Sequence, residues 1–303
     1  MKKIFYNAEE ARFRAGWRIL AFIVLFWTCA AAVFAVKPLL GDITRREFMG
    51  YYGVLVIGII ALGATITVPL ARRYFDKRPL VSLGLALDRR TLPTLVFGFL
   101  LSGAMAGLVY LLMLGLGAVE LNGLNLGRTF EHREGAPGFI RFMSTVSAGA
   151  ILVLLLETVL VGYWEELVFR GYLLQNMIDG MGLKIAIAAS CLVYGLVHAM
   201  NPNAGLLSCA IIVLFGFMRL YGYLATRLLW LSMGMHIGWN FFQGPVFGFA
   251  ASGHAKISVM NITPTGPDWL SGGAFGPEGS VLIIPVVGLA MLAMRWWANK
   301  TAP

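Results

Sequence analysis

Apolar residues occupy most of the chain, in stretches that are long enough to cross a membrane. A membrane-spanning helix needs about 20 consecutive apolar residues, and such stretches recur along the sequence with polar breaks between them. The pattern predicts an all-α, polytopic membrane protein with about eight transmembrane helices. The predicted spans are Trp17 to Val36, Tyr51 to Ala71, Leu95 to Val119, Ala148 to Gln175, Ile185 to Ala199, Leu206 to Ala225, Leu229 to Ala250 and Val281 to Trp297.

The composition supports an integral membrane protein. The chain of 303 residues is 58% hydrophobic and only 13% charged, whereas soluble domains carry about 25% charged residues. Its mean hydropathy is +0.76. We expect one integral membrane domain, divided into N-terminal transmembrane helices (1–147), a central core (148–250), and an outer loop with a last transmembrane helix (251–303). Two segments rich in Gly, Pro and polar residues, Glu120 to Phe139 and Ser252 to Ser280, are expected to be long outer loops.

The distribution of positive charge predicts the orientation. Lys and Arg concentrate in the N-terminal segment and between Arg72 and Arg90, so the positive-inside rule places both termini in the cytoplasm. The first apolar run is long and lacks a clear cleavage site, and we interpret it as a retained anchor. The net charge of +9 fits contact with anionic membrane lipids. No basic groove with aromatic platforms is evident, so we expect no nucleic-acid partner.

The cysteines show no functional spacing. Cys29, Cys191 and Cys209 all fall in apolar spans, without a metal-ligand or redox motif. We interpret them as small buried hydrophobic residues.

Two adjacent carboxylates and an arginine interrupt one of the apolar spans. Ionisable groups at membrane depth are energetically costly and indicate a functional site. In a helix, Glu166 and Arg170 stand four residues apart on one face, while Glu165 is turned by about 100°. Arg170 can then neutralise Glu166 and leave Glu165 as a general base. The alternative is a buried ion network that only fastens helices together.

His198, on the next span, is expected to lie at the same membrane depth as Glu165. Glu165 precedes the turn at Gly180 to Leu183 by as many residues as His198 follows it, which places each about 22 Å from the turn. In an antiparallel helix hairpin the two side chains would therefore face each other. The alternative for His198 is a packed, hydrogen-bonded core residue.

A second histidine is accompanied by an amide. His236 and Asn240 stand at i and i+4 on one helix face, where they can donate to a developing oxyanion or where the histidine can ligate a metal. They can also serve as polar contacts between helices. Glu157, another acid within a span, is interpreted as structural or cavity-lining.

The predicted spans place His198 near the outer end of its helix and His236 near the inner end of its own. Either the two helices on each side of the turn at Gly180 extend into the cytoplasm, or the span boundaries differ from those predicted.

Three sequence motifs together resemble a known family. They are Glu-Glu-Leu-Val-Phe-Arg-Gly-Tyr-Leu at 165–173, Tyr-Gly-Leu-Val-His at 194–198, and His236 to Asn240 preceded by Leu-Trp-Leu-Ser-Met-Gly-Met at 229–235. This ordered set, over roughly Ala148 to Gly248, is similar to the CPBP family, which comprises CAAX proteases and bacteriocin-processing enzymes and is also called the Abi family.

The resemblance implies an eight-helix intramembrane endopeptidase and a CPBP-like core at 148–250. It implies that Glu165 and His198 activate the attacking water, that His236 and Asn240 stabilise the oxyanion, and that Arg170 orients Glu166. The second motif usually begins with Phe. Tyr194 stands there instead, on the same helix face as His198, and can add a hydroxyl group to the site.

The sequence leaves the metal question open. Glu165, His198 and His236 could bind zinc, with water as the fourth ligand. A metal-free mechanism is the favoured interpretation, because no His-Glu-x-x-His motif is present. The metal-free mechanism requires no cofactor. Dependence on zinc or another divalent metal is the alternative.

The sequence therefore predicts a membrane-embedded peptidase that hydrolyses a membrane-attached or lipidated peptide. Tight loops favour a bacterial inner membrane, where a membrane-protein segment or a secreted peptide would replace a prenylated tail. One alternative is a non-catalytic binding protein, such as a bacteriocin self-immunity protein. The other is a transporter with Glu157 and Glu165 as relay acids. The oligomeric state is not determined by the sequence.

Overall fold

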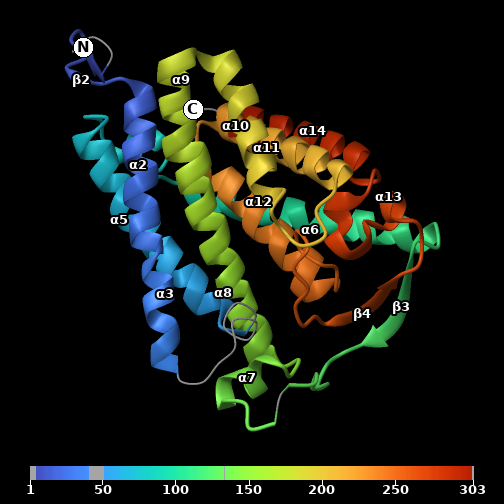
Figure 1. The fold of residues 1–303 in the computed structure, drawn as a ribbon. Helices are drawn as coiled ribbons and strands as arrows, with labels where there is room; N and C mark the ends of the chain where they lie inside the picture. The colour runs from blue at the N-terminus through green and yellow to red at the C-terminus, as the bar shows by residue number, and fades with distance from the viewer. Residues whose placement is uncertain (1–4, 41–50, 133, 302–303) are drawn as a thin grey trace.

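The computed structural model describes residues 5–40, 51–132 and 134–301. This part of the chain is mostly helical, as predicted (Figure 1). The main helices are α2 (Ala15–Ala30), α5 (Gly53–Tyr74), α6 (Thr91–Gly115), α8 (Ala148–Glu165), α9 (Leu174–Met181), α10 (Leu183–His198), α11 (Leu206–Thr226), α12 (Leu229–Phe241) and α14 (Ile283–Thr301). The shorter helical segments are α3 (Ala32–Val36), α7 (Gly138–Met143), α13 (Asp268–Ser271), the 3₁₀ turns η1 (Lys37–Leu40), η2 (Leu80–Leu83), η5 (Gly273–Phe275) and η6 (Pro277–Gly279), and the π-helices η3 (Glu166–Leu173) and η4 (Phe242–Val246).

Four helical stretches of the described residues are long and apolar enough to cross a membrane. These are Ala15–Leu40, Gly53–Tyr74, Thr91–Gly115 and Leu206–Thr226. Leu183–His198 is apolar but shorter. The chain is thus an integral membrane protein with a helical fold. A count of about eight spans stays a prediction, as do the three divisions of the chain.

The two segments that were expected to be loops contain strands that pair with each other. β3 (Val119–Leu124) and β4 (Met260–Pro264) form an antiparallel pair, with an irregularity between Leu121 and Gly123. Figure 1 shows this pair at one side of the helices. A second short pair joins β1 (Tyr6–Asn7) to β2 (Arg12–Phe13). The loop prediction was wrong at β3 and β4, because the two partners are far apart in the sequence and short strands show little periodicity on their own.

Close helix packing positions α12. Gly234 and Gly238 are spaced one helical turn apart and face α6, where an added Cβ would lie 2.1 Å from the Leu95 carbonyl oxygen or 2.4 Å from that of Phe99. The Ser102 hydroxyl of α6 donates to the Met235 carbonyl at 2.7 Å. Small residues at this spacing let helix backbones approach closely in membranes. The glycines therefore fix the depth and rotation of the helix that carries His236 and Asn240.

The helix that carries the paired carboxylates is longer than a bilayer is thick. α8, η3 and α9 form one continuous run from 148 to 181, which is about 50 Å long at about 1.5 Å per residue. The hydrocarbon core measures about 30 Å. Figure 1 shows this run extending along the length of the molecule, with α10 returning beside it. The length favours helices that extend beyond the bilayer, the first of the two explanations for the different apparent depths of His198 and His236.

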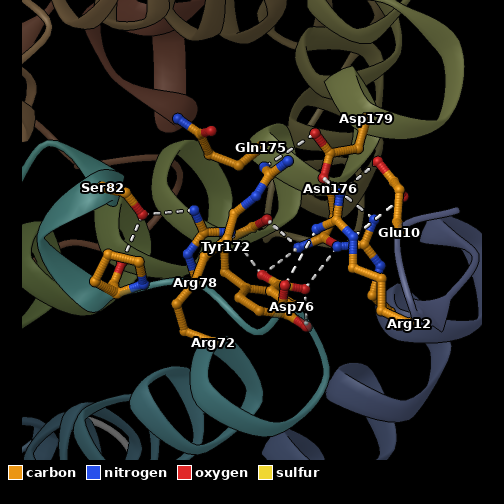
Figure 2. Close-up of polar contacts among 12 residues, drawn as sticks. Glu10, Arg12, Arg72, Asp76, Arg78, Ser82, Tyr172, Gln175, Asn176 and Asp179 are labelled. Atoms are coloured by element: carbon orange, nitrogen blue, oxygen red, sulfur yellow. Dashed lines mark hydrogen bonds and ion pairs between the residues drawn. The ribbon is translucent and has the colours of Figure 1, made fainter.

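A buried ion cluster ties α2, α5 and α9 together near the start of α2. Its centre is Asp76, which is 1% exposed. One carboxylate oxygen accepts from Arg18 Nη1 at 2.9 Å, and the other accepts from Arg72 Nη1 at 2.7 Å and from Asn176 Nδ2 at 3.1 Å. The Tyr172 hydroxyl lies 3.4 Å away. We call these five residues the Asp76 cluster; Figure 2 labels Arg72, Asp76, Tyr172 and Asn176.

A second carboxylate extends this network towards the surface. Asp179 on α9 pairs with Arg12 and Arg18 at 3.2 Å each, and with Arg78 at 3.1 Å. Figure 2 labels Arg12, Arg78 and Asp179. Part of the positive charge that the sequence assigns to lipid contact is therefore engaged within the protein.

Candidate active site

The paired carboxylates stand at the junction of α8 and η3. Glu165 ends α8, and Glu166 begins the π-helical segment η3. Arg170 Nη1 donates to Glu166 Oε1 at 3.1 Å, which is the pairing predicted from the spacing. The backbone differs from the uniform α-helix assumed for that prediction. Segments of π-helix are frequent at functional sites because they redirect side chains within a helix.

Glu166 is the centre of a second buried ion cluster. Its side chain is 0% exposed. Besides Arg170, Oε1 accepts from His236 Nδ1 at 2.8 Å and lies 3.6 Å from Arg219 Nε, and the Ser232 hydroxyl donates to Oε2. These five residues form the Glu166 cluster. It holds α11 and α12 against η3 and leaves Glu166 with no exposed surface for a water molecule.

Glu165 has a different environment. Its side chain keeps 14% of its surface exposed. Glu165 Oε2 accepts from the Tyr194 hydroxyl at 2.9 Å and lies 3.8 Å from His236 Nε2. The hydroxyl group that distinguishes Tyr194 from the usual Phe therefore contacts the carboxylate that is predicted to be the base.

Tyr194 also connects Glu165 to His198. His198 Nδ1 lies 2.8 Å from the Tyr194 carbonyl oxygen, and the two rings are in tilted contact, with 4.4 Å between centroids. A carbonyl only accepts, so Nδ1 carries the proton, and neutral His198 keeps a lone pair on Nε2. An imidazole held in this way can accept a proton from water.

His236 is held through the same nitrogen atom. Its Nδ1 donates to the Glu166 carboxylate, and in the neutral ring Nε2 therefore carries the lone pair on the side of Glu165. Asn240, one turn further along α12, lines the same cavity. In this geometry Asn240 is a ready donor to an oxyanion, whereas neutral His236 can donate nothing further.

A cavity of about 420 Å³ joins these side chains. Glu165, Tyr194, His198, His236 and Asn240 all line it, whereas Glu166 and Arg170 lie behind its wall. The structure thus gathers the sequence-predicted residues at one place. Their catalytic roles stay predictions.

Glu157 also lines the cavity, in agreement with its interpretation as a cavity-lining acid. It forms an ion pair with Lys256, from the segment between η4 and β4. His254 of the same segment also lines the cavity. Burial and the nearby positive charge of Lys256 hold the pKa of His254 below its usual range, which favours the neutral ring at pH 7.

Glu278 attaches that segment to α12. Its carboxylate accepts from Trp239 Nε1 at 2.9 Å, and from the Ser252 backbone N–H and hydroxyl at 2.8 and 2.7 Å. Glu278 is 3% exposed. One buried acid therefore holds the wall of the cavity in place.

Several of these residues were not identified from the sequence. Arg219 offered a usable signal, because it is a charged residue within an apolar span. Glu278, Lys256 and His254 fall in the segment expected to be a loop, where charged residues are ordinary. Ser232 offered no signal.

The positions of Glu165, His198 and His236 can be compared with those needed to bind zinc. Among the described residues, no three His, Cys, Asp or Glu side chains are grouped so that they could hold a metal ion. Each histidine does donate its Nδ1 hydrogen to an oxygen atom, as metal-ligating histidines do. Glu165, His198 and His236 are therefore not grouped as a set of metal ligands.

Residues 147–242 match the family model described as Rce1-like, a type II CAAX prenyl endopeptidase. This segment is about a third of the chain and contains all three motifs. The match confirms the resemblance to the CPBP, or CAAX protease, family. Among curated proteins, none matches the chain.

Proposed function

We propose that the protein is an intramembrane endopeptidase in which Glu165 and His198 activate water for attack on a peptide bond. The observation that carries this proposal is the contrast between neighbouring acids. Glu166 is fully buried and ion-paired, whereas Glu165 reaches the cavity beside two imidazoles. The family of the matched segment supports hydrolysis of a peptide bond.

The site residues divide the reaction between them. A water molecule near Glu165 and His198 Nε2 would attack the carbonyl carbon as Glu165 takes its proton. Asn240 would donate to the oxyanion that forms. When the tetrahedral intermediate collapses, the carbon–nitrogen bond breaks, and the proton returns from Glu165 to the leaving nitrogen.

The cavity supports an apolar or lipidated substrate. Its lining includes Val56, Ile57, Leu154 and Val161 from α5 and α8. A prenylated peptide, as in the description of the matched family, and an apolar segment of a membrane protein both fit such a lining. We further propose that the protein resides in a bacterial inner membrane with both termini in the cytoplasm. Glu157 is engaged in an ion pair with Lys256, which argues against its role as a relay acid of a transporter.

The test replaces Glu165 by Gln, which keeps the shape of the side chain and removes the base. Membrane-bound and secreted peptides are compared between cells that carry the intact protein and cells that carry Glu165→Gln. We expect specific fragments to disappear with the variant while its membrane level is unchanged. Glu120→Gln, at an exposed position on β3, is the matched control and should keep every fragment.

Identical peptide profiles for the intact protein and Glu165→Gln would overturn the proposal. The metal question has a separate measurement, in which purified protein is assayed with and without a strong zinc chelator. We expect cleavage to persist, and its reversible loss would instead support a zinc site.

A further inference from the structure

Arg219 is a buried cation whose Nε–H group has no hydrogen-bond acceptor among the described residues. It belongs to α11 and is 3% exposed. Its Nε lies 3.6 Å from Glu166 Oε1, beyond hydrogen-bond distance, and its Cζ lies 4.9 Å from the centroid of the Tyr194 ring. Within the described residues, Nε has no hydrogen-bond partner, although Arg219 lines the cavity.

Arg219 is not needed to neutralise Glu166, because other side chains already donate to both carboxylate oxygens. Arg170 donates to the same oxygen atom at 3.1 Å, His236 donates at 2.8 Å, and the Ser232 hydroxyl covers the other oxygen. A buried guanidinium N–H group without an acceptor is costly, because it has lost its hydrogen bond to water. Its position at the cavity wall indicates a ligand that supplies the missing acceptor.

The proposed reaction creates such an acceptor and leaves few other donors for it. The Tyr194 hydroxyl is engaged by Glu165, and the Nδ1 hydrogen of His236 is engaged by Glu166. Asn240 is neutral. An oxyanion in a water-poor cavity gains most from a charged, preorganised donor.

We propose that Arg219 is a catalytic residue that donates to the oxyanion of the tetrahedral intermediate. This inference rests on the proposed function. Water oxygen bonds to the carbonyl carbon, its proton moves to Glu165, and the electron pair of the carbon–oxygen double bond moves onto oxygen. The negative charge thus passes from Glu165 to the oxyanion beside a fixed cation. Collapse restores the double bond, breaks the carbon–nitrogen bond and protonates the leaving nitrogen.

The test uses purified full-length protein in detergent and an S-prenylated, fluorescence-quenched peptide. Arg219→Met removes the charge with little change of volume, and Arg219→Lys keeps the charge without the planar fork. We expect kcat to fall about 10² to 10³-fold in Arg219→Met, as when an oxyanion donor is lost. KM should change little, because the contact forms only in the transition state.

Two further measurements separate catalysis from structure. In Arg219→Ala, millimolar guanidinium should restore part of kcat, whereas a purely structural defect would not respond. Arg227→Met makes the same change at the exposed end of α11 and should keep the kinetic constants of the intact protein.

The outcomes distinguish this inference from the proposed function. If the intact protein cleaves the peptide, Glu165→Gln does not, and Arg219→Met keeps kcat within about twofold, the role of Arg219 is refuted and the peptidase stands. A fall in kcat that follows the loss of folded protein, without rescue by guanidinium, also refutes it. If the intact protein is inert on this peptide and Glu165→Gln changes no cellular fragment, both proposals fail.

Discussion

Two carboxylates of this protein are fully buried, and each is paired with two arginines. Asp76 pairs with Arg18 and Arg72, and Glu166 pairs with Arg170 and Arg219. Both acids have fully buried side chains, and each contacts a hydroxyl group and residues from several helices.

The difference lies in how the arginines are used. The two terminal nitrogens of Arg72 donate hydrogen bonds to Asp76 and to Ser82. Those of Arg18 donate to Asp76 and to Asp179. Arg219 has a 3.6 Å ion contact with Glu166, lies 4.9 Å from the centroid of the Tyr194 ring and borders the cavity. In the Asp76 cluster the terminal nitrogens of both arginines are hydrogen-bonded, although their Nε atoms have no partner among the described residues. Such a cluster fastens helices, whereas a cluster with a cation at a cavity wall is suited to bind something else. Burial and charge alone do not separate the two cases.

The largest effect that tests this comparison is expected from Asp76→Asn. The change leaves Arg18 and Arg72 without their shared carboxylate, and loss of one partner from a buried ion pair costs about 3–5 kcal/mol. Unfolding in detergent, followed by tryptophan fluorescence, should show this loss in the free energy of unfolding. The folded fraction should keep its activity, because no residue of the Asp76 cluster lines the cavity.

Asp88→Asn is the control for that measurement. Asp88 forms an exposed pair with Arg90 at 2.8 Å, and its loss should leave the unfolding midpoint unchanged. An Asp76→Asn protein as stable as the intact protein would show that the Asp76 cluster is not a structural fastening.

A more direct comparison replaces one arginine of each cluster by Met. Arg72→Met should lower the free energy of unfolding by about 3 kcal/mol or more, because Asp76 then loses a charged hydrogen bond. Arg219→Met removes a 3.6 Å ion contact but no hydrogen bond to Glu166, so its free energy of unfolding should fall by less than that of Arg72→Met. The measurement is the same unfolding titration, and equal losses in both variants would erase the distinction between the clusters.

The smallest effect is expected from Tyr194→Phe. The variant loses the hydroxyl that donates to Glu165, but it keeps the ring that stacks under Arg170 at 4.1 Å. Since Phe is the usual residue at this position of the motif, we expect kcat to fall by no more than about tenfold. Steady-state kinetics on the same peptide provide the measurement. A loss as complete as that of Glu165→Gln would show that Tyr194 takes part in the chemistry itself.

Local spacing allowed much of the site to be predicted. Glu166 and Arg170 pair at i and i+4 because one helical turn separates them. The helix hairpin brings Glu165 and His198 to one cavity, as their equal distances from the turn predicted. These features depend on short-range geometry, which a sequence shows directly.

Other features depend on contacts between distant segments. β3 pairs with β4, Glu278 holds Ser252 beside α12, and Lys256 reaches Glu157. Each joins positions far apart in the chain, where polar residues give no sign of their partners. The π-helical segment also escaped prediction, because its sequence reads as an ordinary amphipathic helix.

The sequence by itself determined that this is a helical membrane protein with two acids, two histidines and an amide in apolar surroundings. It did so because the bilayer imposes long apolar runs and makes every buried charge conspicuous. Only the tertiary structure decided which acid is neutralised by several helices, which acid reaches the cavity, and which arginine borders it. Those properties arise from hydrogen bonds across the fold, and no local pattern encodes them.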